Sequence, residues 1–450
     1  MSGVSSRTTL TNAKSPNFLK TMTDFSEATV LVSCNPLFVS LAERLARDFK
    51  KVYLRCPRGG NFPELTKGMV GQGLENVELV CSIPGPHFEE IDLFVFPDLG
   101  QACEQIDLEE RGKRVWGARH GEDLENYREL CKNEMEKRGL PVQPWRKIKG
   151  ITALRSWLKA HKDQHVKINK WRGLTESFFS PRFEVVETKL DDIEKKLGAF
   201  KETLDFIVED DLPDRIEVGI DSFTIDGEWP NNTLVGIEAK DIGYVGQVRP
   251  CDKIPEPICR WNQKMSDFFE RQGSRCNVSN EIRIGEDQEP YMIDATIRMP
   301  SPPGELWQEM CSNLCEIYWE GANGTLVEPK FRGKWGVEVI LKSPFARENH
   351  LPVFVPEQFD PFVKLYNSVT IDGCRYVLSQ GEDMEEIGSV IGWGGSLDEA
   401  VARVQKVGES VEAYGVKFSL GSVDQVRAQI EEMDDIGLSV FDMDKEKEPA

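Results

Sequence analysis

The chain has 450 residues, of which 40% are hydrophobic and 29% charged, and this predicts a globular protein of two to four domains. Its net charge of −21 argues against a protein that binds nucleic acid through a broad basic surface. Eleven scattered cysteines without a Cys-x-x-Cys pair, no secretory signal and no apolar run of roughly 20 residues predict a cytoplasmic protein without structural zinc, a disulfide framework or a membrane span.

The first part of the chain divides into two predicted units. Residues 1–26 are rich in Ser, Thr and Asn and are expected to form a mobile arm. Residues 27–118 alternate short apolar strands with helical patterns, which predicts a parallel sheet with helices on its faces. The strands are expected at 29–33, 51–55, 77–81, 91–96 and 114–117. The first strand-to-helix turn, at 33–37, lacks Gly-x-Gly-x-x-Gly, which weighs against a dehydrogenase.

Residues 119–350 carry mixed helix and strand patterns. Helices are expected at 122–139, 151–160, 191–201, 257–272 and 305–319, and strands at 165–171, 206–208, 215–225 and 234–239. Taken alone, Lys132 on the first helix and Lys167 on the first strand are typical of solvent-exposed lysines, although lysine also binds phosphate as a point charge. The strand at 206–208 leads into an acidic segment that ends at Leu212, and this is also typical of an ordinary strand exit.

Residues 281–298 predict a hairpin with its turn at 286–289. In this register Glu281 faces Asp294 and Arg283 faces Met292. Alternation along the strands places one set of polar side chains on a single face, namely Glu281, Arg283, Asp294, Thr296 and Arg298.

Two facing carboxylates repel each other, so a positive group is expected between them. Two interpretations of the hairpin remain open at this point. The arginines fill the gap in a surface salt-bridge cluster, or a hard divalent cation binds the carboxylate oxygens.

The C-terminal part of the chain begins with the Pro-rich loop 300–304. This loop either contacts an anionic substrate at the start of the following helix or serves as a rigid connector. Residues 351–437 predict a small domain of short strands, at 363–367, 375–378 and 388–391, with helices from 396 and over 423–433. The charged residues 438–450 are expected to form a disordered tail.

In chain order these features resemble the ATP-grasp superfamily. They are a lysine seven residues before a Gly-Leu-Pro, a lysine on the following strand, an apolar strand ending in acidic residues, and carboxylates thirteen residues apart with an arginine four beyond. The likeness is greatest to phosphoribosylamine–glycine ligase and its distant relatives, and extends from about Ala28 to the segment Gly388–Val401. It implies an α/β fold with a parallel-sheet domain at 27–118, a two-lobed ATP-clamping region at 119–350 and a small α+β domain at 351–437.

The resemblance implies a role for each matching residue. Lys132 and Lys167 would reach the ATP phosphates, and Glu217 would bind the ribose. The adenine would be held by the backbone of Val208, Glu209, Asp210, Asp211 and Leu212. Glu281 and Asp294, with Thr296, would hold Mg²⁺ or Mn²⁺. Arg298 and Arg283 would stabilise the transferring phosphoryl group.

The chain departs from the family at two places. The family usually has Glu-x-Asn where this chain has Asp294-Ala295-Thr296, so one of two expected metal ions is predicted to bind weakly. The loop after Lys167 carries one glycine, Gly173, where phosphoribosylamine–glycine ligase has several. Closure over the phosphates is therefore expected to differ and to use Arg172 or Thr175.

The predicted activity is that of an ADP-forming carboxylate–amine ligase that acts through an acyl phosphate. A carboxylate–thiol ligase or phosphotransferase on the same fold, and a non-catalytic nucleotide-binding protein, remain alternatives. The expected partners are ATP, a divalent cation and small carboxylate and amine substrates, and the oligomeric state is left open.

Overall fold

The computed structural model describes residues 24–57, 66–83, 85–170, 177–379 and 384–443. Most of the predicted arm, the end of the predicted tail and the loop with Arg172, Gly173 and Thr175 lie outside the described residues. Within the described residues, no helix is long and apolar enough to cross a membrane.

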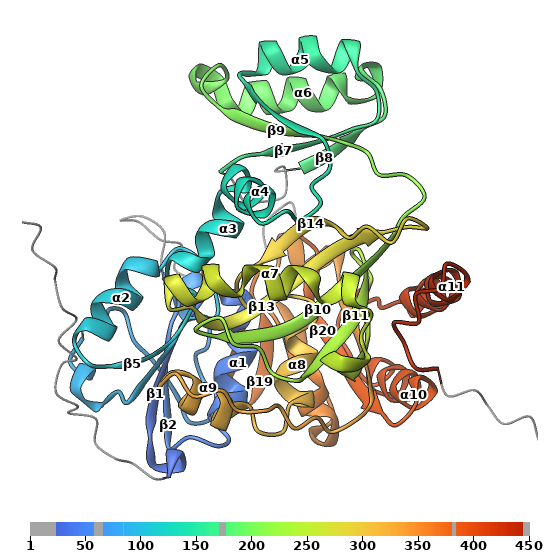
Figure 1. Cartoon of the computed structure of the whole chain (residues 1–450). Helices are drawn as coiled ribbons and strands as arrows, with labels where there is room; N and C mark the ends of the chain where they lie inside the picture. The colour runs from blue at the N-terminus through green and yellow to red at the C-terminus, as the bar shows by residue number, and fades with distance from the viewer. Residues whose placement is uncertain (1–23, 58–65, 84, 171–176, 380–383, 444–450) are drawn as a thin grey trace, which may run out of the picture.

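An all-parallel sheet forms the N-terminal part of the molecule, as predicted (Figure 1). Its strands have the order β3-β2-β1-β4-β5, with bounds β1 Thr29–Ser33, β2 Lys51–Arg55, β3 Val77–Leu79, β4 Leu93–Val95 and β5 Arg114–Trp116. Side chains alternate across β1, so Val30 packs with Leu41 of α1 (Val39–Leu45), and Leu31 packs with Leu108 of α2 (Ala102–Glu110). Short 3₁₀ turns occupy Phe25–Glu27, Pro36–Phe38, Thr66–Met69 and Phe88–Glu90.

The single helix predicted over 122–139 is wrong, because the chain breaks at Tyr127. A 3₁₀ turn, Arg119–Glu122, leads into α3 (Asp123–Asn126), and α4 begins at Arg128 and ends at Lys137. Tyr127 has an extended backbone, φ −127° and ψ 91°. Asn169 accepts hydrogen bonds from the first N–H groups of α4, with its carbonyl from Arg128 and its Oδ1 from Glu129 (2.9 Å), and so caps a new helix.

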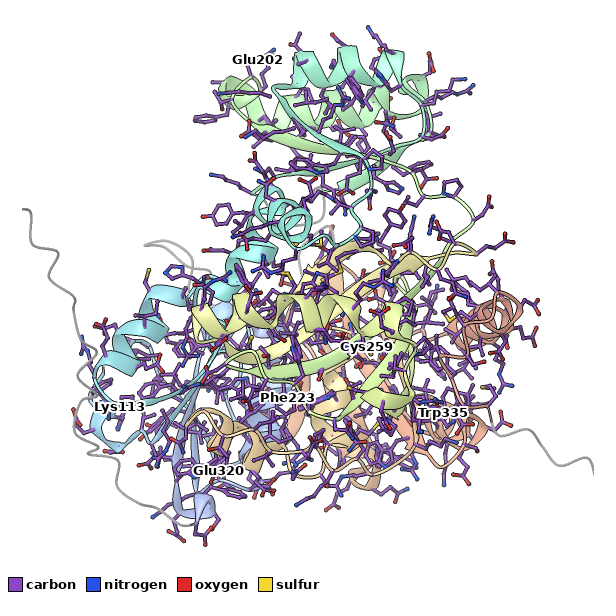
Figure 2. The ribbon with its side chains drawn as sticks, viewed as in Figure 1. Lys113, Glu202, Phe223, Cys259, Glu320 and Trp335 are labelled. Carbon is purple, nitrogen blue, oxygen red and sulfur yellow. The ribbon has the colours of Figure 1, made fainter. Side chains whose placement is uncertain are left out.

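A small lobe covering 145–210 projects from the body of the molecule (Figure 1). Its antiparallel sheet has the order β6-β9-β7-β8, with bounds β6 Trp145–Lys149, β7 Gln164–Ile168, β8 Ser177–Ser180 and β9 Asp205–Asp210. Helices α5 (Ile151–Ala160) and α6 (Phe183–Leu197) and a turn at Gly198–Phe200 complete it. Leu154, Leu190 and Phe206 share its core, and Glu202 lies at its outer end (Figure 2).

An eight-stranded sheet, the large sheet, forms the centre of the molecule. The strand order is β14-β13-β10-β11-β12-β15-β20-β17. The bounds are β10 Ile216–Ile225, β11 Asn232–Ala239, β12 Gly243–Pro250, β13 Arg275–Ile284, β14 Tyr291–Thr296, β15 Trp335–Lys342, β17 Val363–Leu365 and β20 Glu386–Gly394. Phe223 and Trp335 mark buried positions on it (Figure 2).

Five helices accompany the large sheet: α7 Glu256–Gln272, α8 Gly304–Met310, α9 Leu314–Gly321, α10 Leu397–Gly408 and α11 Gly421–Asp435. Ser396 accepts from the N–H of Glu399, whose carboxylate accepts from Gly395 N (2.8 Å), so the predicted capping box of α10 is confirmed. A three-stranded sheet of β16 (Leu351–Val353), β19 (Cys374–Val377) and β18 (Ser368–Ile371), and turns at Cys251–Lys253, Pro344–Arg347 and Glu357–Phe362, complete the fold.

The single helix predicted over 305–319 is also divided, into α8 and α9. The start of α8 is filled by the protein itself, because the buried Glu338 of β15 accepts a hydrogen bond from Leu306 N (3.0 Å). Glu305 is buried beside it and accepts from Ser301 Oγ (2.9 Å). These contacts support the connector interpretation of the loop 300–304 rather than anion binding.

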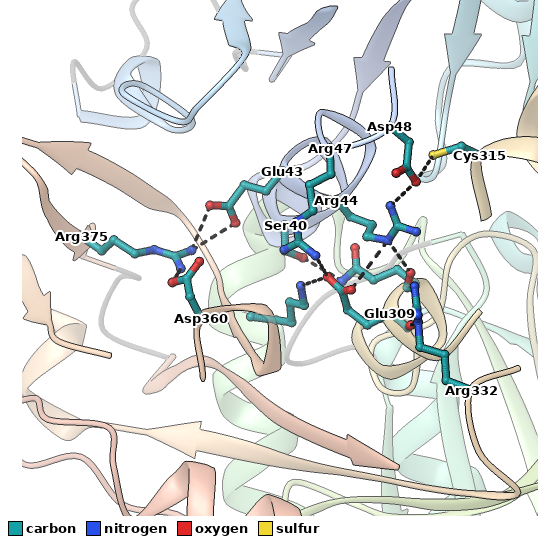
Figure 3. Close-up of polar contacts among 12 residues, drawn as sticks. Ser40, Glu43, Arg44, Arg47, Asp48, Glu309, Cys315, Arg332, Asp360 and Arg375 are labelled. Carbon is teal, nitrogen blue, oxygen red and sulfur yellow. Dashed lines mark hydrogen bonds and ion pairs between the residues drawn. The ribbon is translucent and has the colours of Figure 1, made fainter. Parts of the chain in front are cut away.

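A buried network of charges joins the N-terminal and C-terminal parts (Figure 3). Glu309 of α8 receives Lys364 of β17 at 2.5 Å and Arg47, from just after α1, at 2.7 Å. Arg375 of β19 contacts Glu43 of α1 at 3.1 Å and Asp360 at 2.7 Å. Three segments far apart in sequence therefore depend on each other's charges.

We predict that Lys364→Met lowers the free energy of unfolding by about 3 kcal/mol, because Glu309 would lose its closest buried cation. The matched control is Lys50→Met, whose lysine is 62% exposed in a surface pair with Glu27 and should contribute roughly 0–1 kcal/mol. Chemical denaturation measures both variants. Equal losses would show that the buried network does not hold the parts together.

Candidate functional site

The predicted pairing of Glu281 with Asp294 is confirmed. The two residues are direct partners on neighbouring antiparallel strands, β13 and β14, and Thr296 lies opposite Ser279 on the same ladder. The predicted pairing of Arg283 with Met292 is wrong. The register shifts between Glu281 and Ile282, so that Arg283 pairs with Tyr291.

The irregularity changes which side chains of β14 face the core. Met292 is buried in the core with Ile282, whereas Ile293, which the alternation placed in the core, lines the cavity described below. A β-bulge inserts one residue and re-aims the following side chains. Period-two alternation cannot anticipate this shift.

More carboxylates gather here than the hairpin alone contains. Loss of hydration, with Asp294 and Glu238 nearby, raises the pKa of Glu281 well above its usual range. Burial, with Glu217 and Asp221 nearby, raises the pKa of Glu238 on β11 to about 8. Glu238 follows Ile237 in a strand that was predicted, but nothing in the sequence placed that strand beside the hairpin.

This donor set fits a hard cation. The side chains around Glu281 offer carboxylate oxygens, which Mg²⁺ and Mn²⁺ prefer, and their mutual repulsion is what a positive ion relieves. Within the described ranges, no three His, Cys, Asp or Glu side chains are grouped closely enough to hold a metal ion on their own. A cation held by Glu281 and Asp294 would therefore need oxygens from a bound ligand or water to complete its shell.

The two predicted lysines converge on one buried carboxylate. Lys132 Nζ lies 2.5 Å from Oε1 of Glu209, and Lys167 Nζ lies 3.2 Å from Oε2. Burial opposes ionisation, but the charges of Lys167 and Lys132 together hold the pKa of Glu209 below its usual value. Lys167 also donates to the carbonyl of Ile293 (2.8 Å), which ties the small lobe to β14.

Arg128 is a third cation at this place that the sequence interpretation missed. It lies one helical turn before Lys132, which is the signal that could have identified it. It donates to the carbonyl of Ile168 (2.6 Å). A small void of about 20 Å³ is lined by Arg128, Lys132, Lys167, Glu209 and Asp294, among others.

The segment 208–212 uses most of its backbone within the small lobe. Strand β9 is paired on both sides, by β6 and β7, so Val208 and Glu209 lie in continuous ladders. The N–H groups of Asp210 and Asp211 donate to the carbonyls of Pro144 and Asp163. Leu212 is the residue of this segment whose N–H makes no hydrogen bond to another described residue.

Arg283 lies among acidic side chains from two sides. Its Nε is 3.3 Å from Glu217, its direct neighbour on β10, and its Nη1 is 3.7 Å from Asp211. His165, which the sequence interpretation also missed, contacts Asp211 at 2.8 Å and packs against Phe179 with the rings 4.8 Å apart. This chain of contacts links the small lobe to the large sheet.

The inter-lobe cavity, of about 430 Å³, lies between the small lobe and the large sheet. Its size is within the usual range for small-molecule sites. Its polar lining includes Lys167, Glu209, Glu217, Glu238, Lys240, Glu281, Arg283 and Asp294. A larger cavity of about 600 Å³ lies beside Arg47 and Arg375, but both arginines are already paired with carboxylates.

Arg298 follows β14 and is held from the side of the N-terminal sheet. Its Nε lies 3.1 Å from Glu125 of α3, and its Nη1 donates to the carbonyl of Met299 at 3.1 Å. The N–H of Met299 in turn donates to the carbonyl of Pro97, at the end of β4 (2.9 Å). Of the thirteen predicted site residues, Arg298 is the one that approaches the carboxyl edge of the N-terminal sheet.

The structure is similar to three solved enzymes. Phosphoribosylamine–glycine ligase from Thermotoga maritima has a TM-score of 0.66 at 15% identity, and the match covers 87% of this chain and 99% of that one. The biotin carboxylase domain of 2-oxoglutarate carboxylase from Hydrogenobacter thermophilus, with MgADP, ADP and bicarbonate, has 0.63 at 13%, covering 91% and 98%. N5-carboxyaminoimidazole synthetase from Staphylococcus aureus, complexed with ADP, has 0.57 at 12%, covering 85% and 97%.

These three proteins are ATP-grasp structures, so the chain has the ATP-grasp fold that the order of its motifs predicted. No protein-family model and no curated protein sequence matches the chain.

The buried acids predict a pH dependence of stability. Burial raises the pKa of Asp221 to about 6, although Tyr244 donates a hydrogen bond to it at 2.6 Å. Because the folded pKa lies above the model value of 3.8, its stabilising contribution is complete below pH 4 and is lost as the pH rises through 6. The loss is about 3 kcal/mol for a shift of about two units.

Asp221→Asn should remove this fall in the free energy of unfolding between pH 4 and 6, as measured by denaturation of the ligand-free protein. Asp252→Asn is the matched control, because the Asp252 side chain is 69% exposed. An unchanged pH profile in Asp221→Asn would contradict the assignment.

Proposed function

We propose that the protein is an ATP-dependent carboxylate–amine ligase that forms ADP through an acyl phosphate. The observation that carries the proposal is the pair of facing carboxylates, Glu281 and Asp294, opposite Lys167 in the inter-lobe cavity of an ATP-grasp fold. The three similar structures are a ligase, a carboxylase domain and a synthetase, and two of them contain ADP.

The nucleotide would lie in the inter-lobe cavity with its base against the small lobe. The N–H of Leu212 is placed to donate to an adenine ring nitrogen, and Glu217 to accept from the ribose hydroxyls. Arg283 contacts Glu217 and Asp211, so we assign it to orienting the nucleoside end. This differs from the role at the phosphoryl group that the resemblance implied for it.

The phosphates would lie between the cations of the small lobe and the acids of the large sheet. Lys167 and Arg128 would neutralise phosphate oxygens from one side. Lys132 reaches the same place while paired with Glu209, which fixes its ammonium group.

Glu281 and Asp294 would hold Mg²⁺ or Mn²⁺, with the Thr296 hydroxyl as a neutral neighbour. When bound, the cation bridges phosphate oxygens and neutralises the charge that develops during transfer. Thr296 supplies one weak oxygen where the related enzymes usually have an amide, so we expect a single firmly held cation.

The reaction would take place at the Arg298 end of the site. The carboxylate of the acid substrate attacks the γ-phosphorus, the bond to the β-γ bridging oxygen breaks, and ADP leaves. Arg298 stabilises the charge on the transferring group. The amine then attacks the acyl phosphate, loses a proton and releases inorganic phosphate, which leaves an amide.

Two alternatives use the same cavity. A thiol or an alcohol acceptor in place of the amine would make the protein a thioester-forming ligase or a phosphotransferase. Thr296 in place of an amide favours a nucleotide-binding protein without activity. A phosphate-release screen with MgATP over paired small acids and amines separates these functions, because only the proposed ligase forms an amide together with ADP.

We predict that Glu281→Gln and Asp294→Asn each lower the affinity for MgATP at least about tenfold, the loss that even outer-sphere changes produce at metal sites. Isothermal titration measures the affinity, and Glu256→Gln is the matched control because its carboxylate is 59% exposed in a helical pair with Arg260. Equal MgATP affinity in all four proteins would contradict the metal assignment.

A further inference from the structure

The short helix α3 presents a buried carboxylate to the predicted phosphoryl-stabilising arginine. The side chain of Glu125 is 2% exposed. Its Oε2 accepts a hydrogen bond from the N–H of Ile297 at 2.6 Å, and its Oε1 lies 3.1 Å from Arg298 Nε. One carboxylate therefore fixes both the backbone before Arg298 and the near side of its guanidinium group.

The helical turn that carries Glu125 is itself held in place. Glu122, three residues earlier, accepts a hydrogen bond from Gly100 N at 3.0 Å, just before α2 of the N-terminal sheet. Leu124 packs in the same core as Ala295 and Ile297 of the β14 region. Glu125 thus reaches Arg298 from a support that is packed on the strand it acts on.

We infer that Glu125 is a positioning residue, which holds the Arg298 guanidinium toward the γ-phosphoryl group. The inference rests on the proposed function. Arginine loses much rotamer freedom when it is ordered, and a charged partner that orders it in advance avoids this loss during the reaction. The Arg298 side chain is 27% exposed, so a bound ligand can reach it while Glu125 holds it from the protein side.

The arrangement separates this role from nucleotide binding in general. Glu125 does not line the inter-lobe cavity, where we place the adenine, ribose and cation. Loss of Glu125 should therefore weaken recognition of the γ-phosphoryl group and leave recognition of the diphosphate unchanged. A residue that only supports the fold would weaken both alike.

The test compares two probes, MgADP and the magnesium complex of the β,γ-imido analogue of ATP. Isothermal titration gives the ratio of their affinities for the wild type, Glu125→Gln, Arg298→Gln and the double variant. Glu125→Gln should reduce the preference for the triphosphate analogue roughly 10-fold, in keeping with the cost of a misplaced catalytic group, with MgADP affinity and thermal midpoint unchanged. In the Arg298→Gln background, Glu125→Gln should have no further effect on the ratio.

Glu122→Gln is the matched control, because it alters the same helical turn without touching Arg298, and it should keep the wild-type ratio. Glu125→Asp keeps the charge in a shorter side chain and serves if Glu125→Gln does not fold, with an intermediate ratio expected. An unchanged ratio in Glu125→Gln, an equal loss for both probes, or independent effects in the double variant would overturn the inference. Failure of the wild type to bind either probe would instead contradict the proposed function, and the inference with it.

Discussion

The structure depends on the repulsion between carboxylates that a sheet holds side by side. Glu281 and Asp294 are direct partners, and Glu238 and Glu217 approach them from β11 and β10. Such a grouping persists only where the surrounding backbone is strongly determined. Strand β13 meets this condition, since it pairs with β10 from Ile216–Ile284 to Ile225–Arg275 without interruption. The unpaired negative charge is therefore built into the fold and is available to a cation.

The small lobe supplies the opposite charge, but in a different state. Lys132 and Lys167 are already paired with the buried Glu209, and Arg128 lies on the same side of the cavity. An anionic ligand with a divalent cation would complete an alternation of charge between the two lobes. Lys167 also binds the backbone of Ile293, so the contact that closes the lobes and the contact that would bind phosphate share one side chain.

Much of the fold followed from the sequence, and its failures have physical causes. Strands β1 and β2 are apolar runs between clear boundaries, and the facing of Glu281 and Asp294 follows from counting residues back from one turn. The break at Tyr127 and the bulge at Glu281 were missed because the first is imposed by Asn169 and the second by sheet geometry. Glu238 and Glu125 belong to the site through contacts between distant segments, and no local pattern encodes these.

The most direct test of this account is a crystal structure with Mn²⁺ and ADP, in which anomalous scattering locates the metal. The account predicts an anomalous peak between the carboxylates of Glu281 and Asp294, with the diphosphate facing Lys167 and the adenine edge at the N–H of Leu212. Nucleotide bound in the cavity beside Arg47 and Arg375, or a manganese ion that touches neither Glu281 nor Asp294, would contradict it.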